Sequence, residues 1–150
     1  MKSAFTMIEL IFVIVILGIL ATVAIPRLSA TRGDAVVSKL ASNIMTAASE
    51  ISAYAVSNST VDSNFTIMSN AIRILEVNGD AIVTPNQATV KAGNISDCVT
   101  LSVDVNNTTG VDTLILDTGN ANGDTLCVAL QNAIDENKYP MKLRGSNVTY

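Results

Sequence analysis

One acidic residue interrupts the most apolar stretch of this 150-residue chain. Glu9 lies inside the run of residues 5–25, which holds no other charged residue and follows a short leader that contains Lys2. A carboxylate held in hydrocarbon costs on the order of 3 kcal/mol or more without a partner, so an acidic residue at this place is expected to serve a function. The chemistry open to it is an ion pair with a cation at a similar depth.

The run itself supplies no cation for Glu9. Cleavage between Ala4 and Phe5 would create one, because Phe5 would then carry a free amino terminus. That amine lies too close along the same helix to face Glu9 easily, whereas the amine of a neighbouring copy is not restricted in this way. The spacing therefore favours an ion pair between two subunits.

These residues resemble the prepilin signature of the type IV pilins and the type II secretion pseudopilins. The likeness covers roughly the first thirty residues and combines the leader, an aromatic residue after the cut, the buried Glu9, Gly18 and Pro26. Ala4 departs from the family, which usually has glycine there, but it is the smallest substitute, so cleavage is expected to survive at a lower rate. The matching segment is Phe5-Thr6-Met7-Ile8-Glu9-Leu10 followed by Ile11-Phe12-Val13-Ile14-Val15-Ile16-Leu17-Gly18-Ile19-Leu20-Ala21.

The resemblance implies a domain organisation and a location. Residues 1–4 would be a cytoplasmic leader that prepilin peptidase removes before it methylates the new terminus. Residues 5–26 would be a transmembrane and assembly helix, and residues 27–150 a periplasmic globular domain that includes the second half of the long helix. The protein would start as a single-pass protein of the bacterial inner membrane and end in a periplasmic pseudopilus or a cell-surface pilus. The basic residues alone do not favour this orientation, since Lys2 precedes the run and Arg27 closely follows it.

The apolar run also fits two other interpretations. A secretory signal peptide also has a basic start and an apolar core, and residues 22–24 (Thr-Val-Ala) would pass as its cleavage site. A plain membrane anchor explains the length, because residues 5–25 as a helix would span about 31 Å against a hydrocarbon core of about 30 Å. Neither interpretation gives Glu9 a role.

The composition argues against an enzyme. The chain has no His and no Trp, so the usual base of nucleophilic triads and the commonest metal ligand are missing, and no glycine-rich phosphate loop occurs. Only Lys2 and Glu9 precede Arg27, which leaves 8 basic and 12 acidic residues in the remainder, a net charge of −4. Such a balance disfavours a general phosphate-binding surface.

Past Pro26 the apolar residues recur at helical spacing and predict a stripe that packs against a folded domain. A helix over residues 5–55 would be roughly 75 Å long, so its first half has no partner within the chain outside a membrane or a bundle of like helices. Gly18 and Pro26 weaken that half; the alternatives are a mild kink and, by the resemblance, unwinding on filament assembly. The stripe comprises Val37, Leu40, Ala41, Ile44, Ala47, Ala48, Ile51, Tyr54 and Ala55.

The second half of the chain predicts short elements around a small sheet. They are a helix over residues 63–76, a strand over 99–105, a turn at 106–110 leading back into 113–117, a helix from 124 or 125 to about 137, and a last strand at 147–150. The expected fold class is α+β and pilin-like, a long N-terminal helix packed on a small antiparallel sheet.

Cys98 and Cys127 are 29 positions apart in this half. Export, which the resemblance implies, would place them in an oxidising compartment and favour a disulfide that ties the strand at 99–105 to the late helix. The alternative is a pair of buried free thiols.

A third group of side chains could hold a metal ion. Asp117, Asn120, Asn122 and Asp124 gather oxygen ligands in a glycine-containing loop, and major pseudopilins carry calcium in a late loop. Their spacing is not that of an EF-hand, and Asn-Gly repeats are foremost turn formers. We therefore expect no cofactor, with calcium at this loop as the alternative.

Two segments match the acidic sequon that some bacterial N-glycosylation systems use, an acidic residue two positions before Asn-x-Ser/Thr. They are residues 62–66 and residues 104–108. A chain this rich in Asn, Ser and Thr also produces such matches by chance.

The sequence therefore predicts a structural subunit of a homopolymer or of a mixed polymer with other pilins or pseudopilins. Its other partners would be the inner membrane, prepilin peptidase and a secretion or pilus assembly platform; protein secretion, adhesion, motility and DNA uptake stay open as roles. The alternative is a monomeric membrane-tethered binding module. For DNA, the one basic cluster is more simply a solvated surface in so acidic a domain; it comprises Lys138, Lys142 and Arg144 beside Tyr139.

Overall fold

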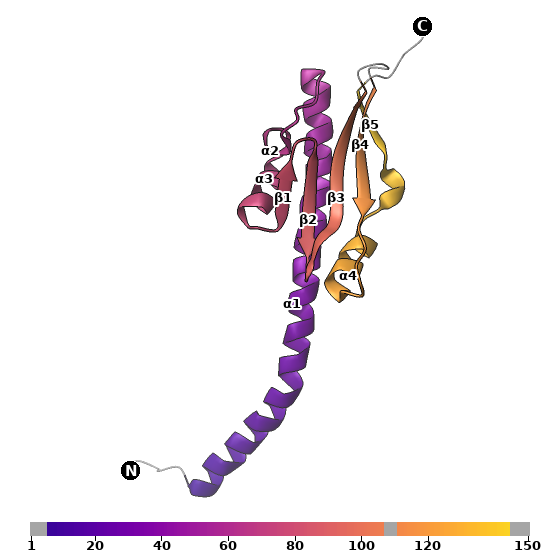
Figure 1. Ribbon diagram of the computed structural model, residues 1–150. Coiled ribbons are helices and arrows are strands. Elements are labelled where there is room, and N and C mark those ends of the chain that lie inside the picture. Colours follow the sequence, from indigo (N-terminus) through magenta and orange to yellow (C-terminus); the bar gives the residue numbers. More distant parts are fainter. Residues whose placement is uncertain (1–5, 107–110, 145–150) are drawn as a thin grey trace, which may run out of the picture. The chain divides into compact units, whose positions relative to one another are not determined.

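The computed structural model describes residues 6–106 and 111–144, with the backbone alone for residues 26–30 and 144. It divides into two compact units, Met1–Val36 and Val37–Tyr150. One helix, α1 (Met7–Asn58), contributes to both (Figure 1). The expected leader and Phe5 lie outside the described residues.

In the first unit, the stretch Met7–Ile25 of α1 is apolar and has no buried face. The stretch Met7–Ile25 has a mean hydropathy of 2.9, none of it is buried within the structure, and it is long and apolar enough to cross a membrane. The backbone remains helical through Pro26 and the residues on either side of it. The helix therefore does not end where the sequence weakens it.

In the second unit, α1 buries the stripe that its periodicity predicts. Ile44, Ala47, Ile51 and Ala55 are fully inaccessible to solvent, and Tyr54 packs partly buried against the same core. Val37, Leu40 and Ala48 are buried as well, and Ala41 packs against the core from its edge. The amphipathic half of the helix is confirmed.

A five-stranded antiparallel sheet forms the other layer of the second unit, and its strands are neighbours in chain order (Figure 1). They are β1 (Ala81–Thr84), β2 (Gln87–Ala92), β3 (Ile95–Asn106), β4 (Val111–Thr118) and β5 (Met141–Arg144). Alternate residues such as Val90, Leu101 and Leu114 are buried and join the stripe of α1 in one hydrophobic core. The α+β fold class is confirmed.

The sequence predicted one continuous helix over residues 63–76, and this prediction is wrong. The segment forms two helices, α2 (Phe65–Met68) and α3 (Asn70–Val77). Ser69 between them is extended, and its hydroxyl accepts a hydrogen bond from Ile72 N at 3.1 Å. Glu50 of α1 accepts from the Ser69 hydroxyl at 2.6 Å and from Ala71 N at 3.0 Å. The break thus gives α3 its own N-terminal cap, held by a residue of another helix.

The late helix is also shorter than predicted. It comprises α4 (Thr125–Ala133) and a separate 3-10 turn, η1 (Glu136–Lys138). Ile134 between them is extended and 5% exposed, so its burial in the core favours leaving the helix at that point. Asp135 then caps η1 by accepting a hydrogen bond from Asn137 N at 3.2 Å.

The hairpin of β1 and β2 was not predicted. Its turn places Pro85 and Asn86 between the paired residues Thr84 and Gln87, and Asn86 has a φ of 59°. Pro followed by a residue with positive φ is the signature of a type II turn. The last strand is β5 in the described residues, and the strand predicted at 147–150 lies outside them.

The carboxylate of Glu50 should make the stability of the domain depend on pH. Burial raises the pKa of Glu50, but the hydrogen bonds from Ala71 N, the Ser69 hydroxyl and Asn70 N outweigh it and hold the pKa below the ordinary value of 4.5. A lowered pKa in the folded state means that the charged group stabilises the fold above the unfolded pKa, and that this contribution is lost as the pH falls through the folded pKa.

We therefore expect Glu50→Gln to cost about 1 kcal/mol near neutral pH in a fragment of residues 31–150, since solvent still reaches the carboxylate. The difference from wild type should shrink as the pH falls through the folded-state pKa of Glu50, which urea unfolding at several pH values would measure. Glu76→Gln on the exposed side of α3 is the matched control. A difference that stays constant with pH would contradict the role given to the Glu50 charge.

Candidate functional site

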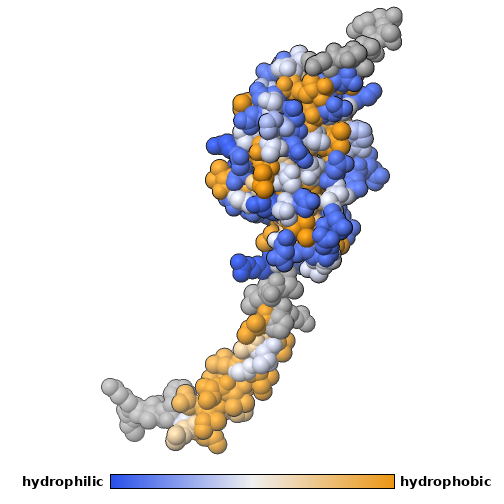
Figure 2. All heavy atoms as spheres, viewed as in Figure 1, coloured by the Kyte–Doolittle hydropathy of each residue, from blue (hydrophilic) through white to orange (hydrophobic). Residues whose placement is uncertain are grey.

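The exposed apolar part of α1 is the first candidate site. Figure 2 shows it as a continuous hydrophobic surface, while the second unit presents a mixed one. Phe12 is 67% exposed and Leu17 58%, values that large apolar side chains rarely reach in a folded protein. At Gly18 an added Cβ would meet nothing within 4 Å. This part of the helix therefore has an exposed apolar surface, with a gap at Gly18 where no side chain projects.

Glu9 lies in the first turn of α1, where it forms a capping box with Thr6. Its carboxylate accepts hydrogen bonds from Thr6 N at 2.8 Å and from the Thr6 hydroxyl at 2.7 Å, and Glu9 N donates to that hydroxyl at 3.4 Å. This reciprocal pair is the one that Thr-x-x-Glu favours at a helix start. Thr6 was missed as a partner of Glu9, although the spacing of three residues could have identified it.

The capping box satisfies hydrogen bonds of Glu9 but leaves its charge unbalanced. No basic residue occurs between Lys2 and Arg27, so the described part of the apolar helix offers no counter-charge. A carboxylate with hydrogen bonds but no cation is still costly in hydrocarbon. Glu9 therefore keeps a reason to find a cation outside its own segment. Ala4 and Phe5, where the cut is predicted, lie outside the described residues.

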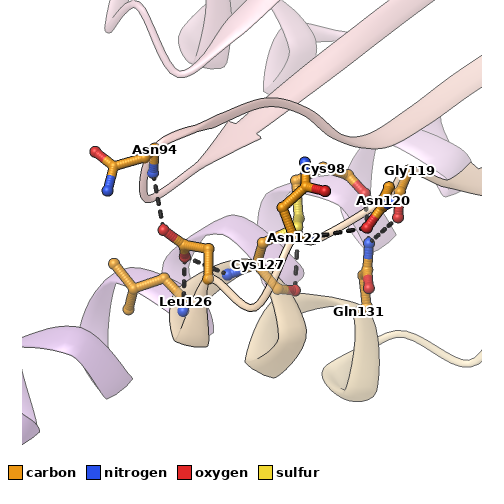
Figure 3. The surroundings of a disulfide bond; sticks show 9 residues. Asn94, Cys98, Gly119, Asn120, Asn122, Leu126, Cys127 and Gln131 are labelled. Atoms are coloured by element: carbon orange, nitrogen blue, oxygen red, sulfur yellow. Dashed lines mark hydrogen bonds between the residues drawn. A yellow bond between two sulfur atoms is a disulfide. The ribbon is translucent and has the colours of Figure 1, made fainter.

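The second candidate site is the disulfide-closed end of the domain. Cys98 in β3 and Cys127 in α4 form a disulfide, as predicted, and both are fully buried. Figure 3 shows Gln131 beside it; its side-chain nitrogen donates to Cys98 O at 3.0 Å and to Gly119 O at 2.8 Å. The bond and this side chain together fasten α4 to β3 and to the chain that leaves β4.

The four residues of the alternative calcium site make contacts within the loop, the end of β4 and the helix that follows. Asp117 is paired with Thr100 at the end of β4, and Asn120 accepts a hydrogen bond from Asn122 N at 2.9 Å. Asp124 is the N-cap of α4. These residues therefore have structural roles in the described chain, and no cluster of three or more His, Cys, Asp or Glu that could hold a metal occurs within residues 6–106 and 111–144.

Asp124 connects three segments through its carboxylate. One oxygen accepts from Leu126 N at 3.0 Å and Cys127 N at 3.1 Å, and the other accepts from Asn94 N at 3.0 Å. The hydrogen bonds from Asn94, Cys127 and Leu126 hold the pKa of Asp124 below its ordinary value and outweigh the opposing effect of burial. Any side chain at Gly93 would collide with this carboxylate. The loop thus ties the turn between β2 and β3 to the start of α4.

The basic cluster is only partly described. Lys138 lies 3.8 Å from the carboxylate of Asp135, and Lys142 is exposed on β5. Burial, and then the charge of Asp135, raises the pKa of Tyr139. An acidic neighbour weakens the field that would attract a phosphate backbone. The interpretation as a solvated surface remains the simpler prediction.

Comparisons of the chain with models of protein families, with curated protein sequences and with solved structures find no match. The features of the chain that bear on its function are therefore the exposed apolar helix with Glu9 and the small domain closed by a disulfide.

Removing the disulfide should destabilise the second unit. Closing a loop of 29 residues restrains the unfolded chain and contributes about 3 to 4 kcal/mol in the chain-entropy model. We expect the Cys98→Ser, Cys127→Ser variant of a fragment of residues 31–150 to melt at least about 10 °C below the wild type. Calorimetry would measure this, with Ser96→Ala on the same strand as control. An unchanged melting temperature would show that the bond does not hold the late helix to the sheet.

Proposed function

We propose that this chain is a structural subunit of a type IV pilus or a type II secretion pseudopilus. Prepilin peptidase would cut after Ala4 and methylate Phe5, and the subunits would polymerise through the helix of residues 5–26, with the domain of residues 27–150 in the periplasm. The observation that carries the proposal is the state of α1, whose first part is entirely exposed while its second part lies in a hydrophobic core.

The exposed part of α1 needs partners outside the chain. Burying one large apolar side chain is worth about 1.5 to 3 kcal/mol, so the fourteen exposed ones together represent on the order of 20 to 40 kcal/mol. A helix that is apolar on all sides is stable in a membrane or among other apolar helices. The fourteen are Met7, Ile8, Leu10, Ile11, Phe12, Val13, Ile14, Val15, Ile16, Leu17, Ile19, Leu20, Val23 and Ile25.

Glu9 favours a bundle of like helices as the final partner. A monomeric anchor gains nothing from a carboxylate in hydrocarbon. Its hydrogen bonds from Thr6 reduce that cost but leave the charge. In a bundle, the methylated amine of a neighbouring Phe5 would stay cationic and could pair with Glu9, an attraction of several kcal/mol before desolvation is subtracted. The pair would also fix the axial register, because a subunit one turn out of place would leave both charges unpaired.

Changing Glu9 should separate membrane insertion from polymerisation. We expect Glu9→Ala to insert into the membrane at least as well as wild type, since it removes the costly group, and to form few filaments. Glu9→Gln should fall between the two, because it keeps hydrogen bonding without the charge. Thr6→Val, which removes the hydroxyl partner but keeps the charge, is the matched control and should assemble better than Glu9→Ala. Sheared filaments would be counted by electron microscopy.

Mass spectrometry of each variant should find a chain that begins at N-methylated Phe5, so that a loss of filaments is not a loss of processing. A chain that begins at Ile25 would instead show signal-peptidase cleavage. Filaments of wild-type yield and length from correctly processed Glu9→Ala would exclude Glu9 as the assembly determinant. The membrane-tethered binding module would then be the better interpretation.

A further inference from the structure

Three Asn-x-Ser/Thr triplets lie wholly within the described residues, at Asn58, Asn64 and Asn94. This triplet is the acceptor for N-linked glycans. Asn64 alone among the three has an acidic residue two positions earlier, Asp62; the corresponding residues before the others are Val56 and Ala92. The acidic residue thus distinguishes the triplet at Asn64 from the other two.

The structure separates them further. Asn58 lies in the last turn of α1, where its side-chain nitrogen donates to Tyr54 O at 3.0 Å and to the Ser57 hydroxyl at 3.1 Å. Asn94 lies in the turn between β2 and β3, held by its backbone N–H on Asp124 at 3.0 Å. The nitrogen that would carry a glycan is therefore engaged at Asn58, and the turn at Asn94 is fastened to α4.

Asn64 presents its side chain differently. Its oxygen accepts from Thr66 N at 2.9 Å and from the Thr66 hydroxyl at 2.7 Å, while Asp62 accepts from Asn64 N at 2.7 Å. No hydrogen bond joins the Asn64 side-chain nitrogen to another described residue. The residue is exposed, precedes α2 outside any helix or strand, and lines an open groove of about 270 Å³ together with Thr84 and Pro85.

We propose that Asn64 is a glycosylation site for an oligosaccharide donated by a polyprenyl-diphosphate carrier. The side-chain nitrogen would attack C1 of the first sugar, the C1–O bond to the diphosphate would break with its electron pair leaving on the diphosphate, and the nitrogen would lose one proton to a base of the transferase. The new C1–N bond leaves the Asn64 oxygen in place, so the cap on Thr66 N survives.

The site rests on the proposed function in one respect, because lipid-linked donors of this kind are used outside the cytoplasm and the domain must be exported to reach them. The disulfide provides an independent marker of export, since such bonds form and persist in oxidising compartments. A failure of export and a failure of the site can therefore be told apart in one sample.

The full chain would be produced in a bacterial host that carries a periplasmic oligosaccharyltransferase and its lipid-linked oligosaccharide, with an acceptor protein of known modification in the same cells. Trypsin cuts after Lys39 and Arg73 and releases residues 40–73. We expect this peptide to gain the mass of the donor glycan, and fragmentation by electron transfer to place it on Asn64.

Four variants test which groups of the triplet and its neighbours are needed for modification. Asn64→Asp keeps a good N-cap but lacks the amide nitrogen, so the glycan should be lost from a folded protein. Thr66→Ala should also lose it. Asp62→Asn, which keeps an oxygen that can accept from Asn64 N, should lower the fraction of Asn64 that carries the glycan. Asn94→Asp should leave that fraction unchanged.

The proposal is overturned if Asn64 stays unmodified while the Cys98–Cys127 bond has formed and the acceptor control is glycosylated. It is overturned equally if Asn58 and Asn94 are modified as fully as Asn64, because the acidic residue two positions before Asn64 would then not select the site. A glycan on Asn64 that disappears in Asn64→Asp supports it, whether or not the chain assembles into filaments.

Discussion

The structure depends on one constraint, that none of the apolar side chains in the stretch Met7–Ile25 is buried by the part of the chain that the structure describes. Water cannot be their final environment, because the exposed side chains represent on the order of 20 to 40 kcal/mol of unburied surface. In the proposed function, a membrane would hold them before assembly, and like helices would hold them afterwards. Glu9 makes the two environments unequal, since a carboxylate without a cation is tolerated in hydrocarbon only at a cost, and a neighbouring subunit could supply the cation.

The second unit includes the C-terminal part of α1 in its hydrophobic core. The buried residues of α1 from Val37 to Ala55 and those of the sheet form this one core. The helix that would polymerise is therefore also a structural element of the domain. Glu50 caps α3 from α1, and Asp124 links α4 to the turn between β2 and β3. The Cys98–Cys127 bond closes the same end. Hydrogen bonds and one covalent link thus fix the small elements, which are too short to be stable alone.

The sequence predicted the features that repeat with a period. The stripe of α1 and the alternation of β3 follow from helical and strand periodicity, and both are present. The break at Ser69 was missed because its cap comes from Glu50, 19 positions away in the chain, and local pattern carries no such contact. The hairpin of β1 and β2 was missed because its strands are short, although Pro85 and its neighbour marked the turn.

Among the candidate site residues, the disulfide was predictable because the chain has two cysteines, hence one possible pairing, and the expected export would place them in an oxidising compartment. The hydrogen-bond partner of Glu9 could have been predicted from the sequence but was not. A cation was sought, and the nearer partner, Thr6, was overlooked although it lies at the spacing of a capping box. The capping role of Asp124 was not predicted; its oxygen was considered only for the alternative of a calcium site, because a helix cap and a metal ligand both need an oxygen in a turn.

The most direct measurement of the central claim is a structure of the assembled fibre by electron cryomicroscopy, at a resolution that shows side chains. We expect the helices of residues 7–25 to pack against one another in the interior, with the Glu9 carboxylate within about 4 Å of the methylated amine of a neighbouring Phe5. Single subunits in lipid, each with its apolar helix surrounded by acyl chains and Glu9 bound only to Thr6, would contradict it.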